Sequence, residues 1–273
     1  MNFAEYICKA GFRQADDAVV RIETAAAEPL ALCNTGAVTV EVADGASVRI
    51  VAAHADGSDA RITVRLGRGA RAEMVGWFDG GRAAVRLHQS AGSSFAMTAV
   101  VTGSAQAEYE TSMEGAGADY RFGGVFLAGE GDSPSVRMHV AHEVADCRSD
   151  STVKGVASGN GRGRFEGLVY VAQDAQRTDA RQTSRNLLIG SEARITALPQ
   201  LEIYADDVKC SHGATVGQMD AEAVMYMRQR GISEPVARRL QVGGFIADVA
   251  MHCAVPEVGE ALMEALEERT ELL

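Results

Sequence analysis

The chain has 273 residues, 47% of them hydrophobic, which is enough for one large domain with a small appendage and argues against wholesale disorder. Aromatic residues make up 5%, glycine is abundant at 29 residues and proline is scarce at 5, a profile that favours many short strands joined by turns over a helical bundle. The net charge of −11 and the lack of a lysine and arginine cluster argue against binding to nucleic acid or to an anionic membrane.

Targeting signals and cysteine spacing favour a cytoplasmic protein. The first residues show no basic segment followed by an apolar run, so no signal peptide is expected. No stretch approaches about 18 uninterrupted apolar residues, so no membrane span is expected either. The five cysteines are scattered without a CxxC pair, which argues against a disulfide framework or a closed zinc site and favours a reducing cytoplasm.

After a lead-in of residues 1–18, the sequence reads as a series of short strands in a domain of residues 19–218. Apolar and polar residues alternate, which predicts strands at residues 38–42, 47–52, 60–66, 71–75, 84–87, 94–101, 107–111 and 120–127. Glycine, aspartate and serine fill the gaps. No segment of helical period interrupts the strands, which argues against alternating strand–helix units.

Two all-β architectures fit this pattern: a sandwich or barrel of hairpins, and a β-solenoid in which each coil stacks on the previous one. The turns lack Asn-Gly pairs and are looser than two-residue hairpin turns. We therefore favour the solenoid. No strict hexapeptide motif is present, so its coils are expected to be irregular.

The last residues, 219–273, predict a small helical domain. Asp220 can cap a helix over residues 221–230, and Gly231 fits the position just after its end. Ser233 with Pro235 predicts a second helix start, and Pro256 opens a third candidate helix. This tail is too small to fold alone, so we expect it to pack on the end of the β domain or on a partner.

Motifs for common catalytic chemistry are absent from the sequence, which has no GxxxxGK[ST], GxSxG or HExxH. Without a GxxxxGK[ST] loop, we expect no nucleotide hydrolysis by this chain. His139 and His142 have opposite parity on a strand and are expected to point to opposite faces.

Cys210 and His212 are two residues apart, so on a strand they point to the same side. A thiolate and an imidazole there could ligate iron or zinc, with the remaining ligands supplied from outside the chain. The alternative reading is a buried cysteine beside a hydrogen-bonded histidine at the end of a β stack.

Residues 177–245 resemble the SufB/SufD family of iron–sulfur cluster assembly scaffolds. The matching segments are residues 186–190 (NLLIG), 197–203 (ALPQLEI) and 205–217 (ADDVKCSHGATVG), followed by Tyr226, residues 230–232, 237–238 and 244–245. The resemblance implies a right-handed parallel β-helix with a small C-terminal α-helical domain, in agreement with the pattern of strands and helices.

The resemblance also implies partners. SufB and SufD chains pair through their β-helices, and each helical tail docks a SufC-type ABC ATPase. Tail residues that would serve this docking here are Asp220, Tyr226, Arg230, Gly231 and Phe245. A homodimer could replace the heterodimer when the chain is made alone.

Two departures favour the SufD side of the family. SufB-like chains carry a cysteine just before the LLIG-type segment, where this chain has Ser184 and its neighbours, and a glutamate where it has Gly213. For a SufD-like chain the resemblance makes His212 the functional residue, at the contact with SufB, with Cys210 beside it. The resemblance also implies a protein that is not an enzyme and that has no resident cofactor, only transient iron or a nascent cluster at that interface. The helical N-terminal region of many relatives is not matched here.

Two other functions remain open. One is a carbohydrate-active enzyme on a β-solenoid, which needs a groove with carboxylates and exposed aromatic rings; a single tryptophan makes such a groove sparse. The other is a purely structural protein that only positions the ATPase.

Overall fold

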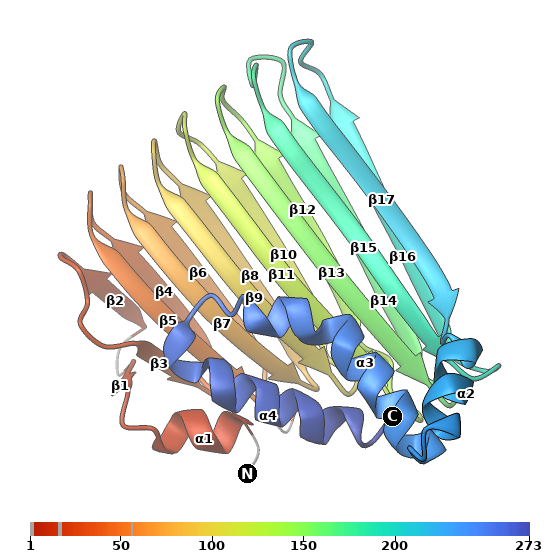
Figure 1. Ribbon diagram of the computed structural model, residues 1–273. Coiled ribbons are helices and arrows are strands. Elements are labelled where there is room, and N and C mark those ends of the chain that lie inside the picture. Colours follow the sequence, from red (N-terminus) through yellow and green to blue (C-terminus); the bar gives the residue numbers. More distant parts are fainter. Residues whose placement is uncertain (1–2, 16–17, 56) are drawn as a thin grey trace.

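In a computed structural model, which describes residues 3–15, 18–55 and 57–273, the chain winds into a stack of coils and ends in helices that fold back along the stack (Figure 1). One sheet contains β1 (Arg13–Gln14), β3 (Leu30–Cys33), β5 (Ser47–His54), β7 (Arg71–Asp79), β9 (Ser94–Thr102), β11 (Asp119–Ala128), β13 (Arg148–Ser158), β15 (Asp179–Ile189) and β17 (Lys209–Gln218). The other contains β2 (Val19–Ile22), β4 (Ala37–Val42), β6 (Ala60–Leu66), β8 (Arg82–Gln89), β10 (Gln106–Met113), β12 (Ser135–His142), β14 (Arg162–Val171) and β16 (Arg194–Ile203). The helices are α1 (Phe3–Lys9), α2 (Ala221–Gln229), α3 (Glu234–Met251), the short 3₁₀ helix η1 (Pro256–Val258) and α4 (Gly259–Thr270).

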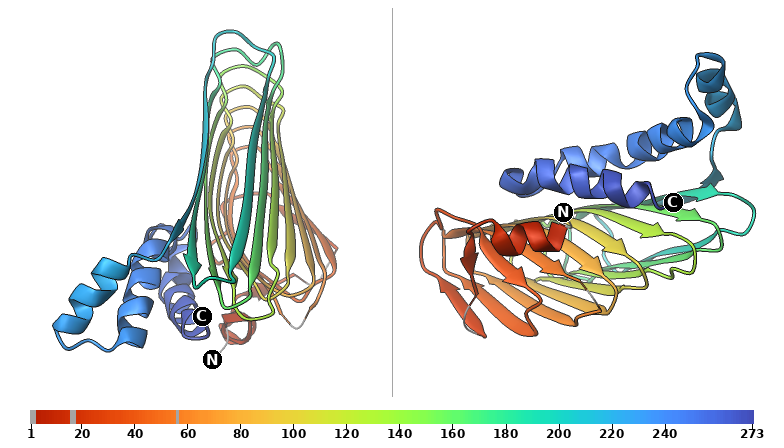
Figure 2. Two further views of the ribbon diagram at one scale, coloured as in Figure 1. Left: turned by 90° about the vertical axis from the view of Figure 1, so that its right-hand side faces the viewer. Right: turned by 90° about the horizontal axis from the view of Figure 1, so that it is seen from below.

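Strands that follow one another in the chain lie in different sheets from β1 to β17, and this alternation decides the architecture. Neighbours within each sheet are parallel and differ by one coil, as with β9, β11 and β13. A sandwich of hairpins would instead pair consecutive strands antiparallel. The parallel β-solenoid expected from the sequence is therefore confirmed. The two sheets face each other in the end-on view (Figure 2, left).

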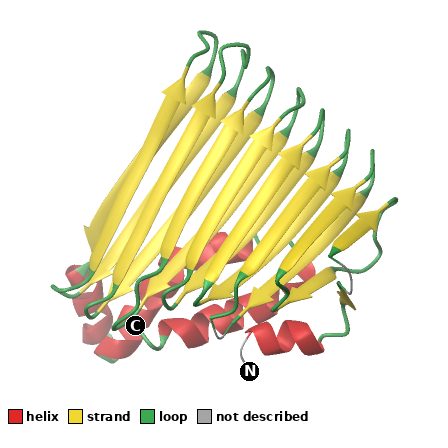
Figure 3. Ribbon diagram, turned by 180° about the vertical axis from the view of Figure 1, so that it is seen from behind, coloured by secondary structure: helices red, strands yellow, loops and turns green. Residues whose placement is uncertain are grey.

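The core between the sheets forms because equivalent residues of successive coils stack in register. Tyr120 lies beside Phe95 of the preceding coil, with ring centres 6.1 Å apart, and Tyr109 meets Phe122 at 4.8 Å. The alternating burial of β6 and β10 shows the expected pattern, with one face inward and the other in solvent. The outer face of the 8-stranded sheet stays uncovered by helices (Figure 3).

A second apolar cluster covers the outer face of the 9-stranded sheet. The later residues of β5 and β7 are buried on both faces, so their sequence there is nearly continuously apolar rather than alternating. Val51 and Trp77 of the sheet pack in this cluster with Val242 of α3 and Leu262 of α4. The tail therefore lies along the side of the stack, whereas the sequence suggested its end or a partner.

The helix boundaries follow the expected capping residues. The Asp220 carboxylate accepts hydrogen bonds from the Glu222 and Ala223 amides and caps α2, while Gly231 adopts a φ of 87° just beyond it. Pro235 lies in the first turn of α3, although Ser233 makes no capping hydrogen bond through its side chain. α2 projects from the sheet (Figure 2, right).

The sequence pattern did not predict the helix α1. Its residues Phe3 and Ile7 are buried in the second cluster, and the Phe3 ring lies 5.4 Å from that of Trp77. Two apolar residues four apart give α1 a narrow apolar stripe, which is too short a signal to identify a helix of 7 residues.

Candidate functional site at the open end of the solenoid

The last coil ends in two strands without a further neighbour among the described residues. β17 pairs with β15 and β16 pairs with β14, and each forms the edge of its sheet. Leu198, Ile203 and Val216 are 39–47% exposed there. An edge strand presents unpaired backbone amides and carbonyls and is a template for pairing with another chain. This end is therefore open for association.

Cys210 and His212 lie on β17 at this open end. The register places Cys210 beside Ala180 and His212 beside Gln182, two β15 residues that face the interior. Both side chains thus share the inward-facing parity of their sheet, and no later coil covers them. Cys210 is half-buried and His212 is exposed.

A buried polar row leads from the interior to His212. Ser151 and Gln182 occupy the same register position on β13 and β15, directly below His212, and both are at most 1% exposed. The Gln182 amide nitrogen donates to the Gly167 carbonyl at 3.2 Å, whereas its oxygen has no partner among the described residues. A Cβ on Gly167 would lie 2.5 Å from that oxygen, so glycine makes the space for Gln182.

Asn186 ties the edge strand to the stack. Its amide nitrogen donates to Ser184 Oγ at 2.9 Å and to the Thr215 carbonyl of β17 at 3.0 Å. The side chain of Asn186 therefore adds a polar contact between β15 and β17, although Asn186 is buried in the interior. Neither Gln182 nor Asn186 was expected to have a role, because the strands predicted from alternation end at residue 127 and do not include β15.

The Cys210 thiol is held in its protonated form by its surroundings. Burial raises the pKa of Cys210, a hydrogen bond from the Ala180 backbone opposes that shift, and the negative charge of Asp179 adds to it. Metal binding would have to displace the thiol proton. No group of three or more metal-ligating side chains lies within the described part of the chain, so Cys210 and His212 offer at most two ligands.

The tail residues assigned to partner binding separate into two groups. Tyr226 and Arg230 are exposed on α2 and its end, and the Arg230 guanidinium lies 5.2 Å from the Tyr226 ring and donates to its hydroxyl at 3.0 Å. Asp220 and Gly231 define the ends of the same helix. Phe245 lies elsewhere: it packs in the second cluster, and its ring is 5.0 Å from the Lys154 ammonium.

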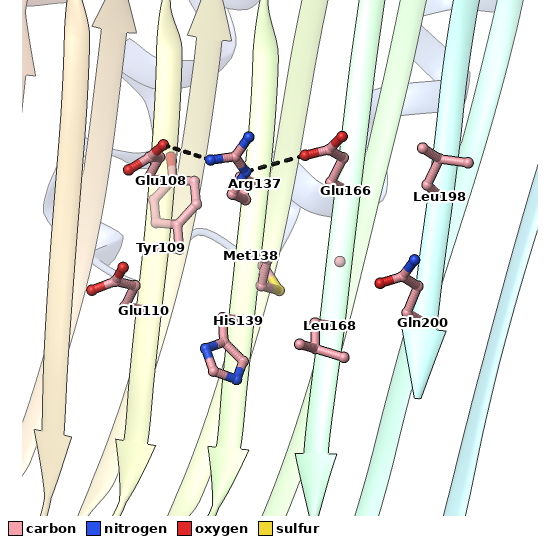
Figure 4. Close-up of a pocket in the computed structure, with 11 residues that line it drawn as sticks. Glu108, Tyr109, Glu110, Arg137, Met138, His139, Glu166, Leu168, Leu198 and Gln200 are labelled. Atoms are coloured by element: carbon pink, nitrogen blue, oxygen red, sulfur yellow. Dashed lines mark hydrogen bonds and ion pairs between the residues drawn. The ribbon is translucent and has the colours of Figure 1, made fainter. Parts of the chain in front are cut away.

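His139 and His142 point to opposite faces of β12, as their parity predicts. His142 is buried beside Ser149 Oγ at 2.8 Å, and burial lowers its pKa to about 4. His139 lines a shallow depression of about 420 Å³ on the outer face of the 8-stranded sheet (Figure 4).

Ion pairs occupy this depression. Arg137 lies between Glu108 and Glu166 and bonds each at 3.1 Å, and hydrogen bonds from Arg164 and Arg137 lower the pKa of Glu166. Tyr109 beneath it is buried, with 3% exposure, and offers no ring to a sugar. The depression therefore contains a network of paired surface charges.

The fold and this end define a class: parallel β-solenoids with an open edge and a helical tail. Residues 18–245 match the family described as SUF system FeS cluster assembly, SufBD core domain. The chain belongs to this family. No helix among the described residues is both long and apolar enough to span a membrane.

Curated relatives carry the same family assignment. The chain is 40% identical over 139 residues to the iron–sulfur cluster assembly protein SufD of Escherichia coli, covering 51% of this chain and 33% of that protein. It is 35% identical over 166 residues to an iron–sulfur cluster assembly SufBD family protein of Mycobacterium tuberculosis, covering 58% and 42%. It is 40% identical over 94 residues to the chloroplastic protein ABCI7 of Arabidopsis thaliana, covering 34% and 20%. The chain thus spans less than half the length of these relatives.

Proposed function

We propose that the chain is a SufD-like scaffold of the SUF iron–sulfur cluster assembly system. It pairs with a SufB-like subunit through the open end of the solenoid and carries a SufC-type ABC ATPase on its helical tail. The observation that carries the proposal is the position of His212 and Cys210: they face inward on the uncovered last coil, in line with the buried Ser151 and Gln182. The family membership and the 40% identity to a SufD protein support it.

Pairing at the open end follows from the chemistry of the edge strands. A partner that adds strands beside β16 and β17 would satisfy their free backbone groups and cover Leu198, Ile203 and Val216. Those side chains are apolar and a third or more exposed, as an interface core requires before association. A second copy of the chain could occupy the same edge when no SufB-like subunit is made.

Iron or a nascent cluster is cargo in this proposal, not a resident cofactor. Cys210 and His212 supply a soft and a borderline ligand, and the partner across the edge supplies the others. The raised pKa of Cys210 means that the thiol binds only as its proton leaves, so loading would release a proton and weaken as the pH falls.

The tail offers an apolar surface to the ATPase. Met225 and Tyr226 of α2 and Leu240 of α3 are 54–60% exposed. A groove of about 500 Å³ between α3 and α4 continues from Leu240. The proposed docking surface consists of these three residues. Phe245 is not part of it, because its ring is engaged with Lys154.

The assembly needs no catalytic group on this chain, and we place it in the cytoplasm, where thiols stay reduced. A carbohydrate-active enzyme is the weaker alternative, because the depression around Arg137 holds paired charges over a buried Tyr109. The other alternative is a purely structural role, in which the chain only positions the ATPase. The substitution His212→Ala distinguishes this role from the cargo role.

The pairing proposal is tested with Val216→Lys, which places a charge on the edge strand β17. The matched control is Val19→Lys on β2, at the opposite end of the stack, because the two valines are 47% and 45% exposed. Sedimentation of each variant with a SufB-like subunit should show at least about tenfold weaker association for Val216→Lys alone, since a buried unpaired charge costs several kcal/mol. Equal association of both variants would contradict pairing at this end.

The cargo role is tested with His212→Ala, and His139→Ala is the control because it removes an exposed histidine from the outer face of the other sheet. Iron content is measured on complexes purified with the SufB-like subunit and the ATPase. We expect His212→Ala to lose iron while the subunits stay together. Unchanged iron and unchanged complementation of cluster assembly would leave the purely structural role.

The docking proposal requires point substitutions, since deleting residues 220–273 would uncover Val51, Trp77 and the rest of the second cluster. The double variant Met225→Ser with Tyr226→Ser removes two exposed apolar side chains, and Met251→Ser, 69% exposed, is the control. Retention of the ATPase should fall in a pull-down with the double variant and persist with Met251→Ser. Full retention by the double variant would place the ATPase elsewhere.

A further inference from the structure

Two cysteines meet where α1 lies on the first coils, far from His212. Cys33 ends β3 and is in register with Ala53 of β5. Ala31 and Ala53 belong to the second cluster, which α1 covers, so Cys33 faces the same side of the sheet. Cys8 lies one helical turn after the buried Ala4 and borders the apolar stripe of α1. The helix α1 contacts β3 directly, and Cys8 is one of the groups that raise the pKa of Cys33, so the two thiols are neighbours.

Hydrogen bonds of Asn34 hold the backbone directly after Cys33. Asn34 follows with a φ of 48°, and its side-chain oxygen accepts hydrogen bonds from the Ala55 amide and from Ser58 Oγ, both at 3.0 Å. Its own amide donates to the Ala53 carbonyl at 3.0 Å. Cys33 is half-buried at the end of β3, and Cys8 is exposed on α1.

We propose that Cys8 and Cys33 form a redox-modification site, in which an intramolecular disulfide staples α1 to β3. The other three cysteines lie on other elements: Cys147 is buried before β13, Cys210 is on β17 and Cys253 follows α3. Among the five described cysteines, Cys8 and Cys33 are the pair that combines an exposed thiol, which an oxidant can reach, with a half-buried thiol on the strand that the helix contacts.

The reaction is a thiol–disulfide exchange with a low-molecular-weight disulfide as the oxidant. The Cys8 thiolate attacks one sulfur of the small disulfide, forms a mixed disulfide and releases one small thiolate. Cys33 then loses its proton to solvent and attacks Cys8 Sγ, which forms the protein disulfide and expels the second small thiolate. Both released thiolates take up the two protons lost by the cysteines. Two protein thiols are oxidised and one small disulfide is reduced to two thiols.

The order of attack follows from the environments. Burial, the hydrogen bond with Cys8 and the charge of Cys8 raise the pKa of Cys33 to about 12, so Cys33 stays protonated at neutral pH. Cys8 is exposed and Cys33 is half-buried, so Cys8 is the residue that meets the oxidant first. Once Cys8 is in the mixed disulfide its charge no longer raises the pKa of Cys33, which favours the second step.

The disulfide would stabilise the position of the tail as well as that of α1. Phe3 and Ile7 of α1 share the second cluster with Val258 and Leu262 of the tail. Fixing α1 therefore fixes part of the surface on which α4 lies. The disulfide closes a loop of about 25 residues, a length for which cross-linking gives appreciable stabilisation.

The test is oxidation of the full chain with oxidised glutathione, followed by peptide mapping without reductant and by thermal unfolding. We expect a Cys8–Cys33 cross-linked peptide as the main product, and a rise in the midpoint of thermal unfolding of about 5 °C that reductant reverses. Cys8→Ser should abolish both effects, and because Cys8 is exposed this variant should keep its fold. Cys253→Ser should keep both effects.

Several results would overturn the proposal. One is an oxidised chain that stops at glutathione attached to Cys8, because Cys33 then fails to reach it. Another is a main cross-link that involves Cys147, Cys210 or Cys253. A third is a midpoint that rises equally in Cys8→Ser, which would assign the stabilisation to some other thiol.

Discussion

Lys154 is a buried charged side chain that links the helical tail to the solenoid, and its substitution measures how much this link stabilises the protein. It lies on the outer face of β13 with 6% exposure. Its ammonium donates to the Phe245 carbonyl and to Asp248 Oδ1, each at 2.6 Å, and lies 5.0 Å from the centre of the Phe245 ring. All three contacts join β13 to α3.

The substitution Lys154→Met keeps the apolar stem and removes the charge. A hydrogen bond to a charged group contributes about 1.5–3 kcal/mol. The Asp248 side chain is 50% exposed, so water can solvate the carboxylate that loses its partner, which places the cost below that of a fully buried broken pair. We expect the free energy of unfolding to fall by about 1–3 kcal/mol, and the midpoint of thermal unfolding by about 2–8 °C.

The measurement is urea unfolding followed by circular dichroism, together with thermal unfolding. Arg185→Met is the matched control: Arg185 is the register neighbour of Lys154 on β15 and is exposed, so its loss should change stability by at most about 0.5 kcal/mol. If Lys154→Met is as stable as the parent, the cost of burying the ammonium cancels its hydrogen bonds, and the reasoning is refuted.

Two further predictions concern a helix cap and a buried histidine. Asp220→Ala removes the carboxylate that caps α2 and should cost about 1 kcal/mol, seen as faster amide hydrogen exchange in α2 but not in β15; uniform exchange rates would contradict it. Burial lowers the pKa of His54 to about 4, so between that value and about 6.5 the unfolded chain binds more protons than the folded one. Stability should be constant above about pH 6.5 and fall as the pH drops toward 4, with a smaller fall in His54→Leu; an equal slope in both proteins would show that His54 does not contribute.

The strands could be predicted from the sequence because the alternation is local. Residues 60–66 match β6 in full, and the predicted strand at residues 47–52 lies within β5. The choice of a solenoid depended on turn composition, but a stronger signal was present. Gly45, Gly69, Gly92 and Gly117 all have positive φ and recur at spacings of 24, 23 and 25 residues. The amides of the first three bond to the next coil's turn.

The position of the tail could not be predicted from its own sequence. Its apolar residues fit helices that pack either on the end of the stack or along its side. The sign that they lie along the side is in other segments: the later residues of strands such as β5 and β7 are buried on both faces of the sheet. For the same reason nothing in the sequence around Lys154 indicates that α3 buries it. At the candidate site, the two-residue spacing was enough to predict that Cys210 and His212 lie on the same side of a strand. That Gln182 lies beside His212 follows only from the pairing register of β15 and β17.

The tail also changes how the stack is expected to unfold. Coils of a solenoid contact only their neighbours, so such a stack can lose its coils one at a time from either end. Here Phe3 beside the first coils and Ile189 in the last full coil belong to one cluster with α3 and α4, and Arg269 of α4 bonds Asp79 at 3.1 Å. Loss of either end coil therefore disturbs contacts shared with the other, which couples the ends into one cooperative transition. During synthesis, the outer face of the 9-stranded sheet stays uncovered until the last helices emerge.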